Sequence, residues 1–229
     1  MSPDLTTTGG EKRVALVMGN GSYLSSPLKN PVNDAKAMAK ALRDLGFDVM
    51  DYYNLDQTAM RRAITRFGEK VSAGGVALVY YAGHGMQVRG RNYLIPVDAE
   101  IASEASVSSE SVDVDTILNQ LGTDGQALNI VILDACRNNP FERRFRSVGG
   151  GLAQIDAPTG TLIAYATAPG KTASDGEGDN GLYTQELLKA LTQPGIKVEE
   201  LFKRVRVRVA KATNNAQTPW EASSLTGDF

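Results

Sequence analysis

The chain has 229 residues, 42% of them hydrophobic and 22% charged, and its formal net charge at pH 7 is −2. This length and composition suit one globular domain with a full core, and the near-neutral charge gives no general attraction to nucleic acid or to a membrane surface. The apolar runs are far too short to span a bilayer. The single cysteine, Cys136, excludes an intramolecular disulfide and a multi-cysteine zinc site.

The chain begins with a polar segment, residues 1–11, that predicts a short disordered leader, and residues 12–229 follow as one domain. The leader has no apolar core like that of a signal peptide, so we expect a cytoplasmic protein. The sequence leaves open whether a native signal peptide or further domains have been removed. It also leaves open whether the protein is a monomer or a homodimer.

Short apolar runs alternate with longer amphipathic runs along the chain. The apolar runs predict buried strands at residues 13–19, 47–53, 76–83, 128–136 and 161–168. The amphipathic runs predict helices at residues 33–46, 56–75, 112–122, 181–193 and 197–213. Strands without polar alternation, separated by helices, predict a three-layer α/β fold with a mostly parallel central sheet and helices on both faces.

Local signals mark several helix ends. Asn33 or Asp34 lies at the start of the first predicted helix, Gly46 lies at its end, and Asp56 is placed to cap the second. The stretch RVRVRV (204–209) alternates with period two, as an exposed strand would, but the apolar residues around it follow helical spacing. We therefore expect a helix there, with a solvated basic face rather than a nucleic-acid contact.

The only histidine and the only cysteine of the chain stand at the ends of two predicted buried strands. His84 follows the run 76–83 within YYAGHG, and Cys136 ends the run 128–136. Because sites in open α/β sheets form at the carboxyl ends of strands, both side chains point into one crevice if these strands are neighbours. Each residue alone is more often structural, but together they predict a thiol–imidazole pair.

Two other regions give weaker signals. Residues 19–26 (GNGSYLSS) follow the first strand but lack the third glycine of a dinucleotide fingerprint and the lysine of a phosphate loop, which argues against a nucleotide-binding domain. A long stretch with little periodicity separates Cys136 from the strand at 161–168. Loops of such length in compact domains are usually functional or disordered.

Four motifs resemble the caspase and metacaspase superfamily. DACRN (134–138), with the histidine about fifty residues upstream, resembles the caspase cysteine signature. YATAPG (165–170) is similar to the strand end before the caspase substrate loop, and NPVNDAKAMAKAL (30–42) resembles the first helix with its entry. QTPWEASSLTGDF (217–229) resembles the closing edge strand of prokaryotic caspase-like domains.

The chain is therefore identified as a member of this superfamily over residues 12–229, and it looks closest to bacterial orthocaspases and metacaspase-like proteins. The resemblance implies a caspase-like sheet of about six strands. It also implies a p20-like part over residues 12–142, a linker over 143–160 and a p10-like part over 161–229.

The resemblance implies a cysteine endopeptidase that works with a dyad. Cys136 would attack a peptide carbonyl as thiolate, and His84 would assist its deprotonation and protonate the leaving amine. The backbone N–H groups of Gly85 and Cys136 would form the oxyanion hole, and a side chain at Gly85 would crowd the substrate. The alternative is a caspase-like scaffold or regulatory module with an idle dyad, but such relatives usually lose the thiol or the imidazole, and this chain keeps both.

Three acidic residues, Asp34, Asp134 and Asp175, stand where animal caspases bind an aspartate side chain. These carboxylates would repel aspartate and attract arginine or lysine, and bidentate pairing with a guanidinium favours arginine. Asp34 has the alternative role of a helix cap, and the place of Asp175 depends on the alignment of a loop.

The loop after Cys136 carries Arg143, Arg144 and Arg146, where caspases are cut during maturation. An arginine-specific peptidase would cleave itself there, and an uncleaved basic loop is the alternative. Protein or peptide substrates with a basic residue before the scissile bond are the expected partners, with no nucleic acid and no membrane.

The dyad itself requires no cofactor, although several metacaspases depend on calcium. Asp98, Asp113 and Asp115 lie where acidic ligands could occur, but their segment has no regular ligand spacing. We therefore expect solvated carboxylates and no metal site, with calcium activation as the alternative.

Overall fold

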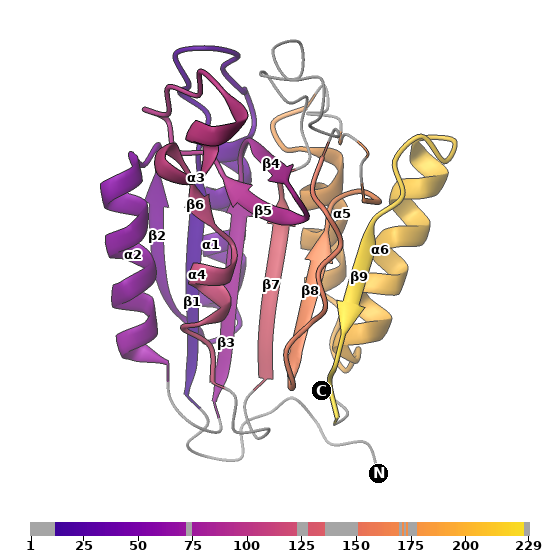
Figure 1. Cartoon of the computed structure of the whole chain (residues 1–229). Helices are drawn as coiled ribbons and strands as arrows, with labels where there is room; N and C mark the ends of the chain where they lie inside the picture. Colours follow the sequence, from indigo (N-terminus) through magenta and orange to yellow (C-terminus); the bar gives the residue numbers. More distant parts are fainter. Residues whose placement is uncertain are drawn as a thin grey trace.

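A computed structural model describes residues 12–71, 75–122, 128–135, 151–169, 171, 173 and 178–226. Six strands form the central sheet in the order β2-β1-β3-β7-β8-β9 (Figure 1). They are β1 (Arg13–Gly19), β2 (Asp48–Tyr53), β3 (Val76–Ala82), β7 (Leu128–Asp134), β8 (Thr161–Tyr165) and β9 (Trp220–Ser223). Neighbouring strands are parallel except β8 and β9, which pair antiparallel, so β9 closes the sheet as an edge strand.

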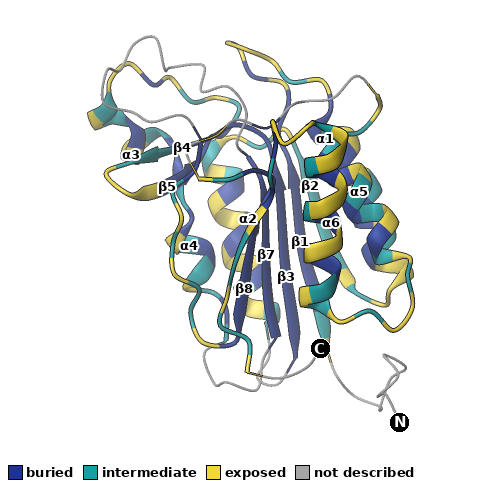
Figure 2. Cartoon of the chain, turned by 90° about the vertical axis from the view of Figure 1, so that its right-hand side faces the viewer, coloured by how far each residue is buried: buried dark blue, intermediate teal, exposed yellow. Residues whose placement is uncertain are grey.

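Helices cover both faces of this sheet. The helices of the described chain are α1 (Pro31–Asp44), α2 (Gln57–Lys70), α3 (Val107–Glu110), α4 (Asp115–Leu118), α5 (Leu182–Leu191) and α6 (Val198–Ala212), with a short 3-10 helix η1 at Glu104–Ser106. Figure 2 shows α1, α5 and α6 on one side of the sheet and α2 and α4 on the other. The predicted three-layer α/β fold with a mostly parallel sheet is confirmed.

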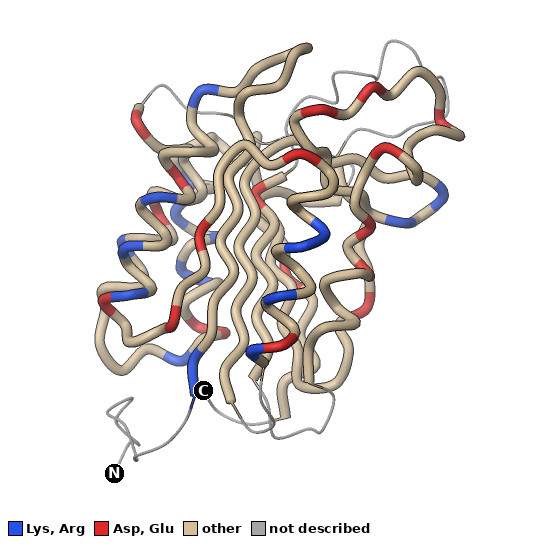
Figure 3. The backbone as a smooth tube through the Cα atoms, turned by 90° about the vertical axis from the view of Figure 1, so that its left-hand side faces the viewer, with Lys and Arg blue, Asp and Glu red and all other residues tan. Residues whose placement is uncertain are grey.

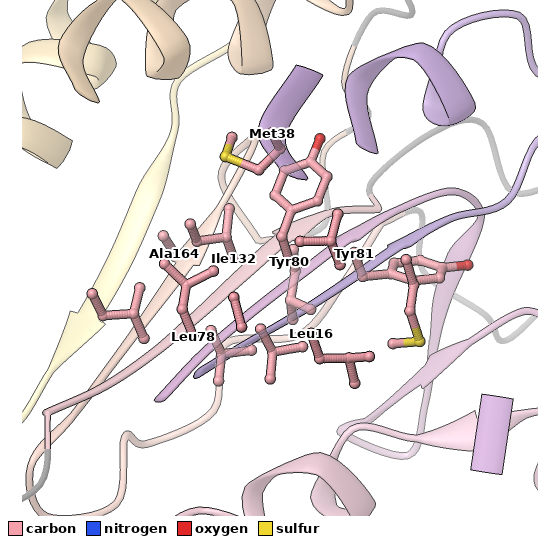
Figure 4. Close-up of a cluster of buried hydrophobic side chains, with 14 of the residues drawn as sticks. Leu16, Met38, Leu78, Tyr80, Tyr81, Ile132 and Ala164 are labelled. Atoms are coloured by element: carbon pink, nitrogen blue, oxygen red, sulfur yellow. The ribbon is translucent and has the colours of Figure 1, made fainter. Parts of the chain in front are cut away.

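The inner strands are apolar on both faces because helices cover both faces. Every residue of β3 and of β7 is buried. Side chains alternate along β3, so Tyr80 lies toward Met38 of α1 while Tyr81 points away from it (Figure 4). Both tyrosines are 0% exposed, so each hydroxyl needs a hydrogen-bond partner inside the protein. Both find their partners at the carboxyl edge of the sheet, among the residues described below.

Several predicted helices differ from the observed ones in extent, and α2 ends at Lys70 rather than at the predicted residue 75. Helix α1 begins at Pro31, earlier than the predicted start at residue 33, because the fixed φ of proline suits the first turn of a helix. The helix predicted over residues 112–122 is mostly wrong. Val112–Asp113 form the short strand β6 instead, and only Asp115–Leu118 are helical.

Two other local predictions are confirmed. The side chain of Asp56 accepts a hydrogen bond from the backbone N–H of Ala59 at 2.7 Å and so caps α2. The RVRVRV stretch is helical within α6, which buries Leu201, Phe202, Val205 and Val209.

A second, smaller sheet lies near the carboxyl ends of the central strands, at the top of Figure 1. It contains β4 (Gly85–Val88), β5 (Arg91–Leu94) and β6 (Val112–Asp113), all antiparallel. The turn between β4 and β5 has φ of 52° at Arg89 and 79° at Gly90, as a type I′ hairpin turn requires. A satellite cluster of apolar side chains includes residues of this hairpin and of the neighbouring loops: Tyr23, Met86, Tyr93, Ile95, Ile101 and Val107.

The surface carries both signs of charge. Lysine and arginine are interspersed with aspartate and glutamate on the face that Figure 3 shows. On α6 the basic side chains pair with acidic neighbours, as Arg204 does with Glu200 at 3.1 Å and Arg206 does with Glu221. Within the described part of the chain, no helix combines the length and the apolar character needed to cross a membrane.

Candidate active site

The ends of β3 and β7 lie side by side, which meets the condition for one shared crevice. The backbone N–H of Gly83 donates to the carbonyl of Asp134 at 3.3 Å, directly across the two strand ends. A Cβ atom at Gly85 would lie 2.8 Å from the carbonyl oxygen of Ala135, so the segment around His84 contacts the end of β7. Ala135 is the residue before Cys136 in the sequence, and Cys136 itself lies outside the described residues.

The imidazole of His84 is 2% exposed and is held on two sides. Its Nε2 atom lies 2.7 Å from the carbonyl oxygen of Ser26, and its ring lies 4.4 Å from the ring of Tyr23 at an angle of 51°. A carbonyl can only accept, so Nε2 carries the proton and Nδ1 carries the lone pair. The hydrogen bond to Ser26 therefore selects the tautomer in which Nδ1 is the basic nitrogen.

Ser26 lies in the loop between β1 and α1. Its φ of 58° falls in the left-handed region that residues other than glycine seldom adopt. Non-glycine residues in this region often belong to functional sites, and here the carbonyl of the residue meets the imidazole. The sequence contains no signal for this contact, because any residue could supply a backbone carbonyl.

Gly85 occupies a position with no room for a side chain. A Cβ there would lie 2.9 Å from the Cβ of Ala135 and 3.1 Å from Cδ2 of Leu152, in addition to the contact with the Ala135 carbonyl. These contacts are with the protein itself and explain the glycine without a substrate, so the prediction that a side chain at Gly85 would crowd the substrate stays a prediction. The role of its N–H group in an oxyanion hole stays a prediction.

Two of the three predicted specificity carboxylates, Asp34 and Asp134, converge on the start of α5. Asp34 is 0% exposed, and its Oδ1 atom accepts from the side-chain amide of Asn180 and from the backbone N–H of Gly181, both at 2.9 Å. Asp34 lies in α1 but thus binds the start of a different helix, α5. The N-cap of α1 is Asn30, and it makes no side-chain capping hydrogen bond.

Asp134 is 1% exposed and contacts the first turn of α5 from the end of β7. Its Oδ2 atom accepts from the hydroxyl of Thr184 at 2.9 Å, and that hydroxyl lies 2.6 Å from the hydroxyl of Tyr80. Because Thr184 gives its single hydrogen to the carboxylate, Tyr80 donates to Thr184. Sequence reasoning missed Asn180 and Thr184, whose contacts with the two aspartates join distant parts of the chain.

The structure does not test four further predicted residues. Asp175 and the loop arginines Arg143, Arg144 and Arg146 lie outside the described residues.

The three carboxylates considered for calcium have other contacts. Asp98 accepts from the backbone N–H of Gln57 at 3.0 Å, and Asp113 and Asp115 contact Arg91 at 2.8 and 3.1 Å. Among the residues that the structure describes, no group of three or more His, Cys, Asp or Glu side chains is placed to hold a metal ion.

Comparison with known proteins assigns the family. The profile described as the caspase domain (Peptidase_C14) matches residues 12–229, so the chain belongs to the caspase domain family. The chain is 31% identical over 163 residues to the human mucosa-associated lymphoid tissue lymphoma translocation protein 1, and to its mouse homologue to the same extent. The match covers 70% of this chain but 19% of each relative. The resemblance to the caspase superfamily is thus confirmed, while a special closeness to bacterial orthocaspases stays a prediction.

Proposed function

We propose that this chain is a cysteine endopeptidase of the caspase type that cleaves peptide bonds after arginine and, more weakly, after lysine. One observation supports it most. A buried imidazole with a selected tautomer lies beside the end of the strand that leads to the only cysteine, and two buried carboxylates lie at the same edge of the sheet. Membership of the caspase domain family gives the reaction type.

The proposed reaction uses Cys136 as nucleophile and His84 as acid and base. Nδ1 of His84 takes the thiol proton, and the thiolate sulfur bonds to the substrate carbonyl carbon to form a tetrahedral oxyanion. The C–N bond then breaks as the imidazolium returns the proton to the leaving amine, which leaves a thioester. Water attacks that thioester, and the C–S bond breaks to release the carboxylic acid and the thiol. The N–H groups of Gly85 and Cys136 would stabilise the oxyanion.

The proposed specificity depends on negative charge that the fold keeps out of water. The start of α5 supplies the positive end of a helix dipole, and the donors Asn180, Gly181 and Thr184 hydrogen-bond the carboxylates of Asp34 and Asp134. Asn180 and Gly181 hold Oδ1 of Asp34 in place, and Thr184 holds Oδ2 of Asp134. A guanidinium can pair with such carboxylates bidentately, whereas an aspartate side chain of a substrate would meet like charge. Asp175 stays a proposed third member of this pocket.

Self-cleavage after Arg143, Arg144 or Arg146 is part of the proposal. Asn92 precedes these arginines in the chain and Ala153 follows them. The side-chain amide of Asn92 donates to the carbonyl of Ala153 and accepts from its N–H, both at 2.7 Å. The strands before and after the loop, β7 and β8, are paired along their length. A cut in the loop would therefore leave both fragments bound to each other.

A panel of fluorogenic peptides with Arg, Lys or Asp before the scissile bond tests this function, with and without calcium. We expect cleavage after Arg, weaker cleavage after Lys and none after Asp. We expect the same rates in calcium and in chelator, because Asp113 and Asp115 pair with Arg91. Cys136→Ala and His84→Ala are the inactive controls, and both should remain single uncut chains. If wild-type protein cleaved no peptide under any of these conditions, the alternative of a caspase-like scaffold with an idle dyad would be favoured.

A further inference from the structure

Two tyrosine hydroxyls from different parts of the chain hold the peptide backbone of His84. The backbone N–H of His84 donates to the hydroxyl of Tyr23 at 2.9 Å. The hydroxyl of Tyr81 donates to the carbonyl of His84 at 2.9 Å. We propose that Tyr23 and Tyr81 are positioning residues that fix the orientation of the His84 imidazole for catalysis, an inference that rests on the proposed function.

The backbone of Ile95 completes this arrangement. Its N–H donates to the carbonyl of His84 at 3.0 Å, and its carbonyl oxygen lies 3.1 Å from each of the hydroxyls of Tyr23 and Tyr81. The side-chain amide of Asn20 donates to the carbonyl of Ile95 at 3.3 Å. The loop after β1, the strand β3 and the segment after β5 therefore meet at the backbone N–H and the backbone carbonyl of His84.

Burial makes these hydrogen bonds effective. Tyr23 is 7% exposed and Tyr81 is 0% exposed, so little water reaches the two hydroxyls. Tyr23 also places its ring against the imidazole, with centroids 4.4 Å apart, and so contacts both the backbone and the side chain of His84. Loss of the Tyr23 hydroxyl would remove this acceptor from the buried N–H of His84, and loss of the Tyr81 hydroxyl would leave the His84 carbonyl with only the N–H of Ile95 of these two donors. Either loss would let the backbone at His84 shift, and the imidazole would shift with it.

Gly83 shows how closely the hydroxyls approach the chain. A Cβ atom at this position would lie 2.6 Å from the hydroxyl oxygen of Tyr23 and 2.6 Å from that of Tyr81. Only glycine leaves room for both oxygens beside the strand end. The first glycine of YYAGHG thus admits the two hydroxyls that hold the following histidine.

A hydroxyl that only stabilises the fold and one that positions an imidazole predict different kinetics. For Tyr23→Phe and Tyr81→Phe we expect kcat on an arginyl peptide to fall by about tenfold to a hundredfold, because small misplacements of a catalytic group cost rate rather than binding. The KM should change by less than about twofold, since the specificity carboxylates are untouched. Tyr93→Phe is the matched control. Tyr93 lies in the same satellite cluster as Tyr23 and is likewise 7% exposed. In the described part of the chain its hydroxyl is not a partner of His84 or Ile95.

A second measurement does not depend on peptidase activity. His84 is the only histidine, so a long-range proton–nitrogen correlation spectrum of isotope-labelled, tag-free Cys136→Ala protein reports its imidazole without overlap. We expect one tautomer, with the proton on Nε2, in the parent and in its Tyr93→Phe derivative. We expect a mixture of tautomers in the derivative that lacks both hydroxyls, Tyr23→Phe with Tyr81→Phe.

The two measurements separate the possible failures. If wild-type protein were inactive but the spectra changed as expected, the tyrosines would still position the imidazole, and only the proposed function would fail. If both Phe variants kept the parent kcat and the double variant kept the single tautomer, the positioning role would be wrong. Should a Phe variant lose its cooperative thermal unfolding, the other single variant decides the kinetic result.

Discussion

Replacement of Asp134 by asparagine removes one charge from the proposed arginine pocket and almost no volume. The side chain is 1% exposed and accepts a hydrogen bond from Thr184 at 2.9 Å, a bond that the amide oxygen of asparagine can also accept. We therefore expect the free energy of unfolding to change by less than about 1 kcal/mol. The effect should appear in catalysis instead, because a buried carboxylate pairs with a guanidinium away from water.

The burial sets the expected magnitude. Loss of one partner from a desolvated charge pair costs about 2–4 kcal/mol, so kcat/KM on an arginyl peptide should fall by about 30- to 700-fold. For a peptide with citrulline, the neutral isostere of arginine, Asp134→Asn should lower kcat/KM far less. Asp44→Asn serves as the surface control, since Asp44 pairs with Lys40 and its side chain is 64% exposed. If Asp134→Asn kept the wild-type preference for arginine over citrulline, the assignment of Asp134 to the pocket would be refuted.

Three further predictions concern the surroundings of the site. Thr184→Val removes the donor to Asp134, so it should lower kcat/KM on the arginyl peptide by about tenfold while labelling of Cys136 by iodoacetamide stays at the wild-type rate. Processed protein should elute from size exclusion as one particle containing both fragments, and separate elution would show that the Asn92–Ala153 contact and the β7–β8 pairing do not hold them. Burial and the hydrogen bond to Asp51 raise the pKa of Tyr53 from 10.0 to about 12. The unfolded chain therefore loses the phenol proton at lower pH than the folded chain, and the free energy of unfolding falls as the pH rises from 10 to 12. Urea unfolding should show this contribution to the fall in wild-type protein and not in Tyr53→Phe.

The sequence predicted the framework of this fold because the relevant signals are local. Each inner strand is a continuous apolar run, and His84 follows one such run, so the carboxyl edge of the sheet could be identified as the site. The hairpin of β4 and β5 gave no comparable signal, since each of its strands has four residues. Its presence matters, because the segment that follows it brings Ile95 to the backbone of His84.

The contacts that hold the site in place could not be predicted, since they depend on the folded chain. The carbonyl of Ser26 selects the imidazole tautomer, and a backbone carbonyl carries no residue-specific signal. Asp34 was expected at the start of α1, where an aspartate often caps its own helix, yet it binds the start of α5, far along the chain. The sequence around Thr184 predicts only an ordinary helix residue, and the structure alone shows that its hydroxyl donates to Asp134.

Covalent labelling is the most direct test of whether Cys136 and His84 act together in a peptidase that selects arginine. Wild-type protein, Cys136→Ala and His84→Ala would each be incubated with a peptidyl acyloxymethyl ketone that carries arginine or aspartate next to the reactive group, and the intact mass would then be measured. We expect one adduct on wild-type protein with the arginyl reagent, located at Cys136 by peptide mapping, with none on Cys136→Ala and much slower labelling of His84→Ala. Labelling by the aspartyl reagent in preference to the arginyl one, or an arginyl adduct that forms equally fast without His84, would contradict this expectation.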